Sequence, residues 1–399
     1  MINDYKIDVL EQPARIAVKQ RGITIGLPHN PDRGDRRFPL TPEAVKTLVD
    51  DYDFKVYMEA GAGAEIHYSD NAYTSHGALI GTRTDVLGAD IVISAAPLGV
   101  NDIKAMRRNA TLWTVLNPSS IDRDILEALN QRGITSLSLP ALSRPDGHHP
   151  VADIISEVEG RAAMVVAAGF LADGIHGKGI LLGGVAGLVP SEVVVIGAGT
   201  AGVAAALSAR GLGAMVRMFD DDPCRLRRAQ EQLGYSVIGS SMHRKVYLSA
   251  LRSADVVINT LEGRDRYAAV IDSGDASQLK RGVILFDLNN NNEISVFPSM
   301  RHVDLSPASE SLPMLTERIC FVNAAGAVPR TLAMALSNAI VPMLAGLAQG
   351  DEHVFMDAVR MNSYLGTGLV TFGGKVVNCE AAKASGMKWV DPAILLRMS

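Results

Sequence analysis

The 399-residue chain has few of the features that mark secreted, membrane-bound or metal-binding proteins. Its three cysteines, Cys224, Cys320 and Cys379, are far apart and form no CxxC motif, so neither a disulfide framework nor a cysteine-based metal site is expected. The first residues are polar, unlike a signal peptide, and no run of about 18 apolar residues is present to span a membrane. These absences favour a protein of the reducing cytoplasm that has no membrane partner.

Long basic runs are also missing. The net charge is −5, so nucleic acid is not an expected partner. The remaining composition, 47% hydrophobic and 20% charged, is that of a soluble globular protein. A chain of 399 residues is too long for one compact core, and we therefore expect two domains.

Short apolar runs typical of strands alternate with helical patterns. Residues 22–28 predict a strand, and residues 41–52 predict a helix that Thr41 opens with Pro42 at its first position. A second helix is expected over residues 122–133, where a glycine ends it. A long, mostly buried helix over residues 155–174 is expected to cross between the domains. This alternation predicts an α/β fold with parallel sheets covered on both faces.

The strongest motif is Gly197-x-Gly199-x-x-Gly202. It follows the apolar run "VVVI", opens a helical pattern and precedes a second strand that ends at Asp220, 23 residues after the first glycine. In this context the glycines allow a tight turn, close approach of a pyrophosphate and close packing of helix on strand, while the carboxylate can hold ribose hydroxyls. The alternative is a glycine turn that binds nothing.

The residues around the motif favour NAD over NADP. Asp221 and Asp222 follow Asp220 and would repel a 2′-phosphate, whereas Arg225 lies nearby and weakens that preference. The cofactor residues expected from the motif are Gly197, Gly199, Thr200, Ala201, Gly202, Asp220 and Arg225.

Several stretches resemble the alanine dehydrogenase and transhydrogenase-domain family. They are "IGLPHNPDRGDRRFPLTPEAVKTLV", "EAGAGAEIHYSDNAYTSHGA", "SEVEGRAA", "GILLGGVAGLVPSEVVVIGAGTAG" and "NAAGAVPRTLAMALSNAIVP". The resemblance implies two α/β domains, with a Rossmann-type doubly wound NAD domain (156–324) inserted into a discontinuous substrate domain (1–155 and 325–399). It also implies a homo-oligomer, a dimer or a hexamer.

The resemblance suggests roles for three residues. Arg37 stands where the family binds the substrate carboxylate, and a guanidinium suits bidentate binding of such a group. The alternative is a surface arginine beside Arg36. Ser156 matches a residue near the cofactor phosphates, and Asn323 matches an asparagine close to the nicotinamide and the substrate.

Three ionisable positions of the family's amino-acid dehydrogenases are changed. By alignment with the family, Ser94 replaces a lysine, Asn117 replaces an acid–base histidine, and Asn291, within the "NNNN" block, replaces an aspartate. None of the three can exchange a proton near neutral pH. Asn117, Asn291 and Asn323 would instead bind a polar substrate through hydrogen bonds, and Asn291 would also face the cofactor.

Two other groups are candidates for the missing acid or base. His148 and His149 precede the "SEVEGR" stretch, and histidine suits proton transfer near neutral pH. The alternative is a solvated histidine pair, and no carboxylate or cysteine at ligand spacing supports a metal site there. Glu157 is also ionisable, but Arg161 lies four residues on and predicts a helical ion pair.

The leading interpretation is an NAD(H)-dependent oxidoreductase that acts on the C–N bond of an amino or imino acid. Because the three proton-exchanging positions are changed, efficient deamination of alanine is not expected. The alternatives are a non-catalytic NAD(H)-binding sensor or scaffold, a transhydrogenase-type NAD domain, and opine-like reductive coupling of an amine with a 2-oxo acid.

Overall fold

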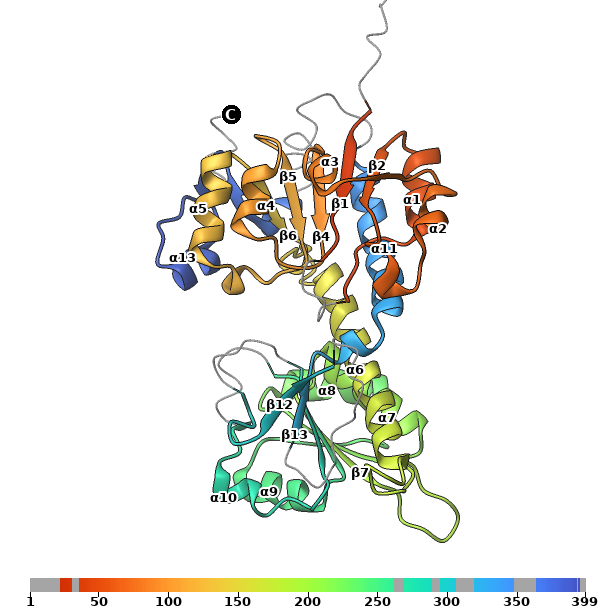
Figure 1. Cartoon of the computed structure of the whole chain (residues 1–399). Helices are drawn as coiled ribbons and strands as arrows, with labels where there is room; N and C mark the ends of the chain where they lie inside the picture. The colour runs from red at the N-terminus through yellow and green to blue at the C-terminus, as the bar shows by residue number, and fades with distance from the viewer. Residues whose placement is uncertain are drawn as a thin grey trace, which may run out of the picture.

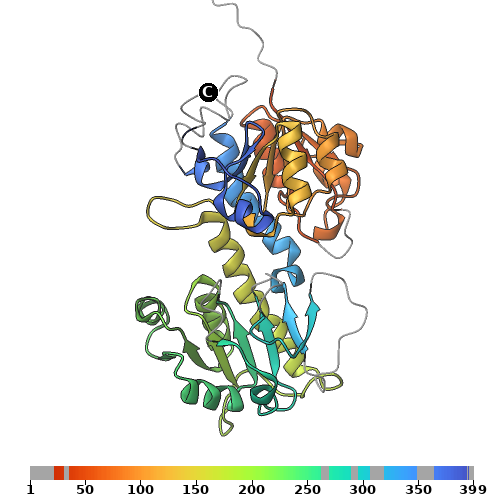
Figure 2. The same cartoon turned by 90° about the vertical axis from the view of Figure 1, so that its left-hand side faces the viewer.

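The computed structural model describes residues 22–30, 36–261, 269–288, 295–305, 319–347, 364–392 and 394. They form two α/β domains, one above the other in Figure 1, which confirms the predicted fold class. Helices α6 (Pro150–Ala172) and α11 (Pro329–Ala345) lie at the neck between the domains, as Figure 2 also shows. Among the helices in these ranges, none is both long enough and apolar enough to cross a membrane.

The upper domain is built on an eight-stranded sheet. Its order is β15-β14-β6-β5-β4-β1-β2-β3, and the strands from β6 to β3 are parallel whereas β14 and β15 are antiparallel. The chain order reverses between β1 and β4, which is the type of point where open α/β sheets bind ligands. The strands are β1 (Thr24–Leu27), β2 (Lys55–Glu59), β3 (Leu79–Gly81), β4 (Ile91–Ser94), β5 (Thr111–Thr114), β6 (Thr135–Ser138), β14 (Leu369–Phe372) and β15 (Lys375–Val376).

Local sequence signals explain the helices of this domain. Helix α1 (Pro42–Asp50) begins where predicted, with the Thr41 hydroxyl accepting from the Ala44 N–H. Helix α5 (Arg123–Arg132) ends at Gly133, whose φ of 71° favours glycine. The other helices are α2 (Asp70–Thr74), α3 (Arg83–Leu87), α4 (Val100–Ala105) and α13 (Cys379–Ser385), with 3-10 turns η1 (Ala64–Ile66), η2 (Pro118–Ser120) and η5 (Leu365–Gly368).

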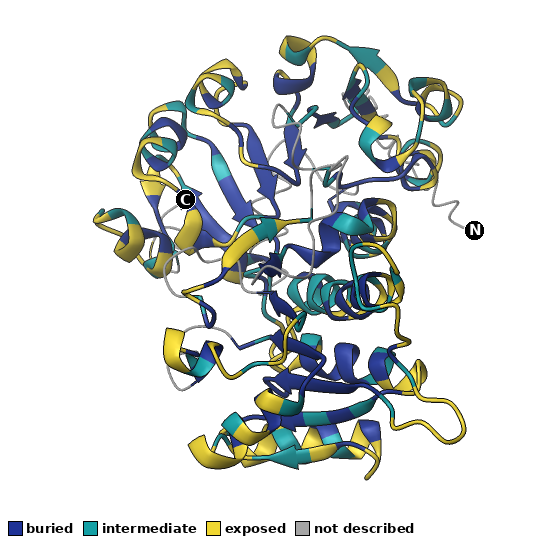
Figure 3. Cartoon of the chain, turned by 60° about the horizontal axis from the view of Figure 1, so that its bottom comes forward, coloured by how far each residue is buried: buried dark blue, intermediate teal, exposed yellow. Residues whose placement is uncertain are grey.

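Alternation along the strands gives this sheet two separate cores. On β4, Ile91 and Ile93 join the core that contains residues of α1 and α11, whereas Val92 joins the core formed with α4 and α5. Successive side chains of a strand point to opposite faces, so a sheet covered on both sides is apolar throughout. Figure 3 shows the buried strands at the centre of each domain and the exposed residues on the outer helices and loops.

The lower domain has a seven-stranded sheet in the order β12-β13-β11-β10-β7-β8-β9, and the pairs with recorded register are all parallel. The chain order reverses between β7 and β10, as in dinucleotide-binding folds. Its elements are β7 (Glu192–Ile196), α7 (Thr200–Gly211), β8 (Met215–Phe219), α8 (Pro223–Leu233), β9 (Ile238–Ser240), α9 (Arg244–Ser253), β10 (Val256–Asn259), α10 (Ser273–Ala276), β11 (Ile284–Asp287), β12 (Arg301–Asp304), β13 (Ile319–Val322) and η4 (Ala324–Ala327).

Helix α6 links the two domains and begins earlier than the predicted residue 155. Pro150 occupies its first position, and the Asp153 carboxylate accepts from the His149 N–H at 3.0 Å, which stabilises the extra turn. The proposed domain boundary at residues 155 and 156 therefore falls inside one helix. Farther along, a Cβ at Gly160 would lie 2.2 Å from the Ala201 carbonyl oxygen, so the glycine allows α6 to pack closely on α7.

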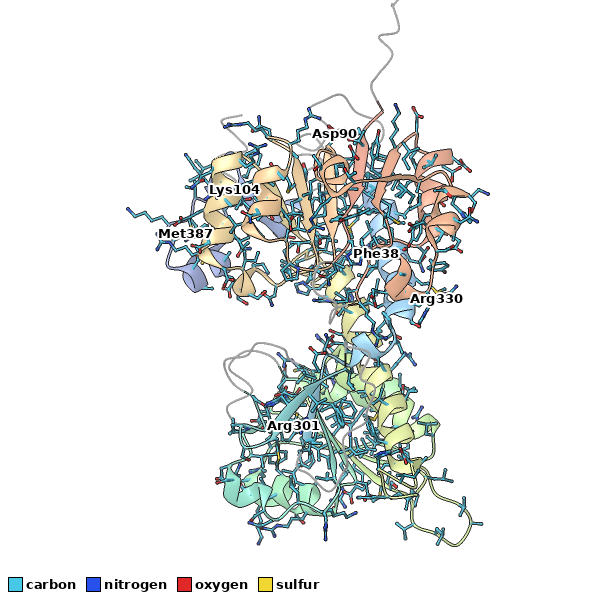
Figure 4. The ribbon with its side chains drawn as sticks, in the orientation of Figure 1. Phe38, Asp90, Lys104, Arg301, Arg330 and Met387 are labelled. Atoms are coloured by element: carbon cyan, nitrogen blue, oxygen red, sulfur yellow. The ribbon has the colours of Figure 1, made fainter. Side chains whose placement is uncertain are left out.

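The carboxyl ends of the strands in both sheets point toward the neck. In Figure 4, Asp90, just before β4, lies at the far end of the upper domain, whereas Phe38 and Arg330 lie at the end nearer the lower domain. The guanidinium of Arg330, at the start of α11, lies 4.2 Å from the centre of the Tyr68 ring. This arrangement brings the loops that carry the predicted site residues to facing ends of the two domains.

Candidate functional site

The glycine loop lies between β7 and α7 and has the geometry that the motif predicts. Gly197 has a φ of 103°, which is open to glycine. A Cβ at Gly202 would lie 2.0 Å from the Gly197 carbonyl oxygen, so only glycine allows this approach of helix to loop. In contrast, a Cβ at Gly199 would meet nothing within 4 Å. The space beside Gly199 is where a phosphate group can approach the backbone.

The start of α7 suits binding of an anion. Gly199 is the N-cap residue and supplies no capping side chain, so the first N–H groups of the helix, including those of Thr200 and Ala201, have no side-chain cap. The helix dipole adds a partial positive charge at the same end. A loop shaped by glycines together with an uncapped helix of this length fits the pyrophosphate of a dinucleotide.

Asp220 follows β8 and is almost completely buried, at 2% exposed. Its two carboxylate oxygens accept from the Ala198 N–H and the Asp222 N–H, both at 2.8 Å. These bonds join the end of β8 to the glycine loop and fix the orientation of the carboxylate. A carboxylate has about four lone-pair sites, so capacity for ribose hydroxyls is retained.

The neighbouring charges partly neutralise one another. The Arg225 guanidinium lies 4.0 Å from the Asp220 carboxylate and 3.6 Å from that of Asp222. Asp222 also caps α8 by accepting from the Cys224 N–H at 2.8 Å, and Asp221 accepts from the Met242 N–H at 2.9 Å. Arg225, the arginine able to bind a 2′-phosphate, is therefore held between the carboxylates of Asp220 and Asp222.

Asp153 connects the start of α6 to the glycine loop. One of its oxygens accepts from the Thr200 hydroxyl at 3.1 Å, and the other accepts from the His149 N–H at 3.0 Å. Ser156 lies about one turn farther along α6 and is half-buried. Glu157 pairs with Arg161 at 2.8 Å, as the helical spacing predicted.

His148 and His149 lie at the start of α6, near this connection. The His148 ring is 74% exposed and lies 3.8 Å from the Asp153 carboxylate. The His149 Nδ1 lies 3.1 Å from the Leu142 carbonyl oxygen, and the residue is classed as exposed. Both histidines thus lie beside Asp153 at the start of α6, and their acid–base role stays a prediction.

Ser94 and Asn117 lie at the carboxyl ends of β4 and β5. Ser94 is buried, and its hydroxyl donates to the Ala96 carbonyl at 2.7 Å. Asn117 is exposed, and its side-chain oxygen accepts from the Ser119 N–H at 3.1 Å and from the Ser119 hydroxyl at 2.9 Å. Both side chains are held by their own loops as neutral polar groups, and neither can take up a proton near neutral pH.

The two arginines after β1 have different surroundings. Arg36 reaches the other side of the neck, where it donates to the Gly326 carbonyl at 2.9 Å and lies 3.5 Å from the Leu305 carbonyl oxygen. Arg37, the predicted carboxylate ligand, is half-buried beside it. Asn323 precedes η4, the turn that contains Gly326, and has a left-handed backbone with a φ of 55°. Asparagine adopts this conformation more readily than most non-glycine residues, so it suits the turn between β13 and η4.

Asn291 lies outside the described residues, as does the rest of the asparagine block. Asp287, at the end of β11 before this block, is 1% exposed. Its carboxylate accepts from the Asn259 side-chain amide and the Ser295 hydroxyl, both at 2.9 Å, and from the Val296 N–H at 3.1 Å. These bonds tie the Asp287 carboxylate to Asn259, Ser295 and Val296, which gives it a structural role.

A charged network anchors the loop after β1. Arg83 pairs with Glu59 at 2.8 Å and with Asp102 at 2.7 Å, and it donates to the His29 carbonyl at 3.0 Å. Glu59 in turn accepts from the His29 N–H at 2.8 Å. The hydrogen bond from Arg83 holds the pKa of Asp102 below its usual range. The network fixes His29, from which the chain leads to Arg36 and Arg37.

Sequence reasoning missed two of these contacts. Arg36 bonds to Gly326, 290 residues away, and Asp153 bonds to Thr200, 47 residues away. The sequence contained one relevant signal, since Arg36 adjoins the predicted ligand Arg37. Asp153 had no signal, because its partner is set by the packing of α6 on α7.

The fold and the glycine loop define a two-domain α/β protein whose second domain is of the dinucleotide-binding type. The alanine dehydrogenase/PNT N-terminal domain matches residues 26–158, and the alanine dehydrogenase/PNT C-terminal domain matches residues 163–379. An alanine dehydrogenase of Mycolicibacterium smegmatis is 30% identical over 381 residues, which cover 94% of this chain and 100% of that protein. This chain therefore belongs to the alanine dehydrogenase/PNT family.

Solved structures agree with this assignment. An L-alanine dehydrogenase superposes with a TM-score of 0.78 at 26% identity, covering 91% of this chain and 99% of that one. A transhydrogenase from Sinorhizobium meliloti has a TM-score of 0.69 at 21% identity, covering 89% of this chain and 99% of that one, and shares the fold. The predicted family is thus confirmed over most of the chain.

Proposed function

We propose that the protein is an NAD(H)-dependent oxidoreductase that acts on the C–N bond of an amino or imino acid. The observation that carries the proposal is the glycine loop at the start of α7, called the phosphate cradle below. Its Gly197, Gly199 and Gly202 have the geometry that binding of a pyrophosphate requires, in a chain of a family that includes dehydrogenases. A nicotinamide cofactor bound there supplies or accepts a hydride. The substrate would be a small molecule whose carboxylate Arg37 binds through its guanidinium.

The polar groups at the end of the upper domain that faces the lower domain favour transfer of a hydride to a pre-formed imine over deamination of alanine. Oxidative deamination needs a base, because water must add to an iminium and ammonia must leave. Ser94 and Asn117 provide hydroxyl and amide groups that orient a substrate without exchanging protons. Reduction of an imine places much smaller demands on proton transfer, and Asn323 and Asn291 would complete its binding site.

The charges around Asp220 support NAD rather than NADP. A buried carboxylate at the end of β8 suits two ribose hydroxyls and disfavours a 2′-phosphate. Arg225, which would offset this repulsion, is already placed between Asp220 and Asp222. The ribose end of the site therefore carries a local excess of negative charge.

We also propose that the protein is a cytoplasmic homo-oligomer, either a dimer or a hexamer. The segment between α6 and β7 projects from the lower domain in Figure 1 and carries exposed apolar side chains. The members of this group, with their exposed fractions, are Ile175 79%, Ile180 39%, Leu181 63%, Val185 52%, Leu188 68% and Val189 86%. Contiguous apolar surface on a soluble protein is typical of an interface, and a second copy of the chain would cover it. Sedimentation at increasing concentration tests this, with Val189→Asp as the disrupting variant.

A substrate screen tests the proposed activity. Purified protein and NADH should turn over some member of a panel of cyclic imines and of 2-oxo acids paired with amines. Arg37→Ala should lower kcat/KM at least about a hundredfold, as expected for loss of the charged group that binds the substrate carboxylate. Arg36→Ala is the comparison variant: it keeps the proposed carboxylate ligand but breaks the bond to the Gly326 carbonyl, so it separates loss of the ligand from loss of that contact across the neck. Robust NAD-dependent oxidation of L-alanine would contradict the proposal.

A non-catalytic NAD(H) sensor is the second candidate, because the same observations fit it. Such a protein would keep the cradle and dispense with proton-exchanging groups at the substrate end. NADH would then bind with ordinary affinity, and no member of the panel would be turned over. NADH fluorescence, measured alongside the screen, separates two results. Binding of NADH without turnover supports the sensor, whereas absence of NADH binding means that the cofactor site itself is wrongly assigned.

A further inference from the structure

A cavity of about 230 Å³ lies in the upper domain, between its sheet and helices α4 and α5. Its lining includes Ser94, Thr114 and Ser136 of the sheet and Leu98, Ile103 and Leu129 opposite them. For comparison, a dry cavity of about 150 Å³ is enough to hold benzene. The volume therefore suits a ring-sized group with room for a substituent.

The side of the cavity formed by the sheet carries hydroxyl groups, and one of them has no partner. The Ser94 hydroxyl donates to the Ala96 carbonyl, and the Thr114 hydroxyl oxygen accepts from the Leu116 N–H at 3.1 Å. Ser136 is 1% exposed, and its hydroxyl forms no hydrogen bond with the described part of the chain. A buried hydroxyl without a partner is costly, so this atom points to a ligand group that bonds to it.

The remaining lining determines the chemistry of that ligand. The helices and loops contribute aliphatic side chains such as Leu98, Ile103 and Leu129. Asp122 is the one charged residue among the described residues that line the cavity, and no cationic side chain is among them. A carboxylate is therefore disfavoured inside, whereas an uncharged apolar body with a hydrogen-bonding substituent fits.

The cavity adjoins both altered positions of the substrate end. Ser94, at the end of β4, contributes directly to its lining, and Leu116 is the residue before Asn117 at the end of β5. Strand β4 is also the neighbour of β1, whose following loop carries Arg37. The cavity and the loop that carries Arg37 therefore follow neighbouring strands of the sheet.

We propose that the cavity receives the side chain of the substrate, and that this side chain is an aromatic ring with a hydroxyl at its far end. The inference rests on the proposed function and narrows its substrate class to phenol-bearing 2-oxo, amino or imino acids. In this arrangement the ring fills the aliphatic space, and its hydroxyl bonds to Ser136. Alanine-sized substrates leave the cavity empty.

Direct binding measurements test the cavity apart from turnover. Calorimetry with the full chain would use pyruvate, phenylpyruvate and 4-hydroxyphenylpyruvate, together with 4-methylphenol, which has the ring and hydroxyl but no carboxylate. Burial of the ring should make phenylpyruvate bind on the order of a hundredfold more tightly than pyruvate. The hydroxyl bond should give 4-hydroxyphenylpyruvate a further advantage of about fivefold.

Two variants make the test specific. Ser136→Ala keeps the space and removes the hydroxyl, so it should abolish the fivefold advantage and leave phenylpyruvate binding unchanged. Leu129→Trp fills the space and should weaken all three ring-bearing ligands, with NADH titration and thermal unfolding confirming that each variant is folded. If Leu129→Trp does not fold, the Ser136→Ala comparison alone decides.

The outcomes separate this inference from the proposed function. If ring-bearing ligands bind more tightly than pyruvate and Ser136→Ala removes the advantage of the hydroxyl, the pocket is supported. If no turnover of NADH accompanies this binding, only the proposed enzymatic activity is overturned. If 4-methylphenol binds as tightly as 4-hydroxyphenylpyruvate, the carboxylate contributes nothing, and the cavity does not receive the substrate side chain. The same conclusion follows if Arg37→Ala leaves the advantage of the carboxylate unchanged. Equal binding of pyruvate and phenylpyruvate would show that the cavity is a packing void only.

Discussion

The carboxyl ends of the strands in the two sheets face the neck from opposite sides, and they hold different kinds of side chains. In the lower domain the positions of the dinucleotide motif are all present, and the uncapped start of α7 and the buried Asp220 support them. In the upper domain Arg37, the proposed carboxylate ligand, is half-buried, and Ser94 and Asn117 are neutral groups bonded within their own loops.

The two sets of side chains suit different tasks. Binding of a dinucleotide depends on backbone geometry, which glycine positions fix and few substitutions tolerate. Proton transfer depends on single side chains with a suitable pKa, and one substitution removes each of them. A family member can therefore retain the cofactor cradle and still act on a substrate that needs less acid–base assistance.

The largest effect is expected for Gly202→Ala. The added Cβ would lie 2.0 Å from the Gly197 carbonyl oxygen, and backbone atoms cannot move aside cheaply. We expect a loss of stability of about 3 kcal/mol or more, since overpacking of a close backbone contact is among the severe mutational effects. Urea unfolding measures the stability, and NADH fluorescence measures the accompanying loss of binding.

Gly199→Ala is the matched control and tests the cradle itself. Its Cβ would meet nothing within 4 Å, and its φ of −79° is open to alanine, so stability should change by less than about 0.5 kcal/mol. The methyl group would nevertheless stand where a phosphate approaches, and NADH affinity should fall at least about tenfold. Unchanged NADH affinity in this variant would mean that the glycine loop is not the phosphate site.

The second prediction concerns the upper domain and its pH dependence. Arg83→Met removes the partner of Asp102 and Glu59, whose side chains are 19% and 21% exposed, and it also removes the bond to the His29 carbonyl. We expect a loss of about 1–2 kcal/mol at pH 7, a value reduced for partial exposure. The variant should also raise KM for the substrate, because the loop that leads to Arg37 loses its anchor.

The sign of the pH effect follows from Asp102. Its folded pKa is lowered, so its contribution to stability is present above the unfolded value, about 3.9, and is lost as pH falls through the folded value. The stability gap between wild type and Arg83→Met should therefore narrow below about pH 4. Arg123→Met, which breaks the exposed pair with Glu127, is the control and should leave the stability and its pH dependence as in the wild type. If the stability difference between wild type and Arg83→Met stays constant with pH, the lost stability comes from packing of the aliphatic part of the Arg83 side chain.

Local signals accounted for much of what could be predicted from the sequence. The cap at Thr41, the stop at Gly133 and the glycine motif each depend on residues close together in the chain, so periodicity and spacing were sufficient. The resemblance added positions such as Arg37 that no local pattern identifies.

The features that were missed depend on tertiary packing. The bond between Arg36 and Gly326 joins residues 290 positions apart, and the unpartnered hydroxyl of Ser136 exists only because α4 and α5 leave space above the sheet. The early start of α6 reflects the bond between Asp153 and the His149 N–H. No spacing rule predicts which side chains such packing brings together.

The smallest effect is expected where the two domains meet. Asp153→Ala removes the bond from Thr200 and so loosens the glycine loop from α6, at a site that is only half-buried. Because the cradle itself is unchanged, NADH affinity should fall about threefold to tenfold and stability by less than about 1 kcal/mol.

Glu157→Ala is the control on the same helix, since its pair with Arg161 is exposed and does not touch the loop. If Asp153 acts by holding Thr200, Asp153→Asn should restore most of the NADH affinity, because an amide oxygen can accept the same bond. Equal losses in Asp153→Ala and Asp153→Asn would instead indicate that the negative charge matters, which would make the start of α6 part of the electrostatics of the cofactor site.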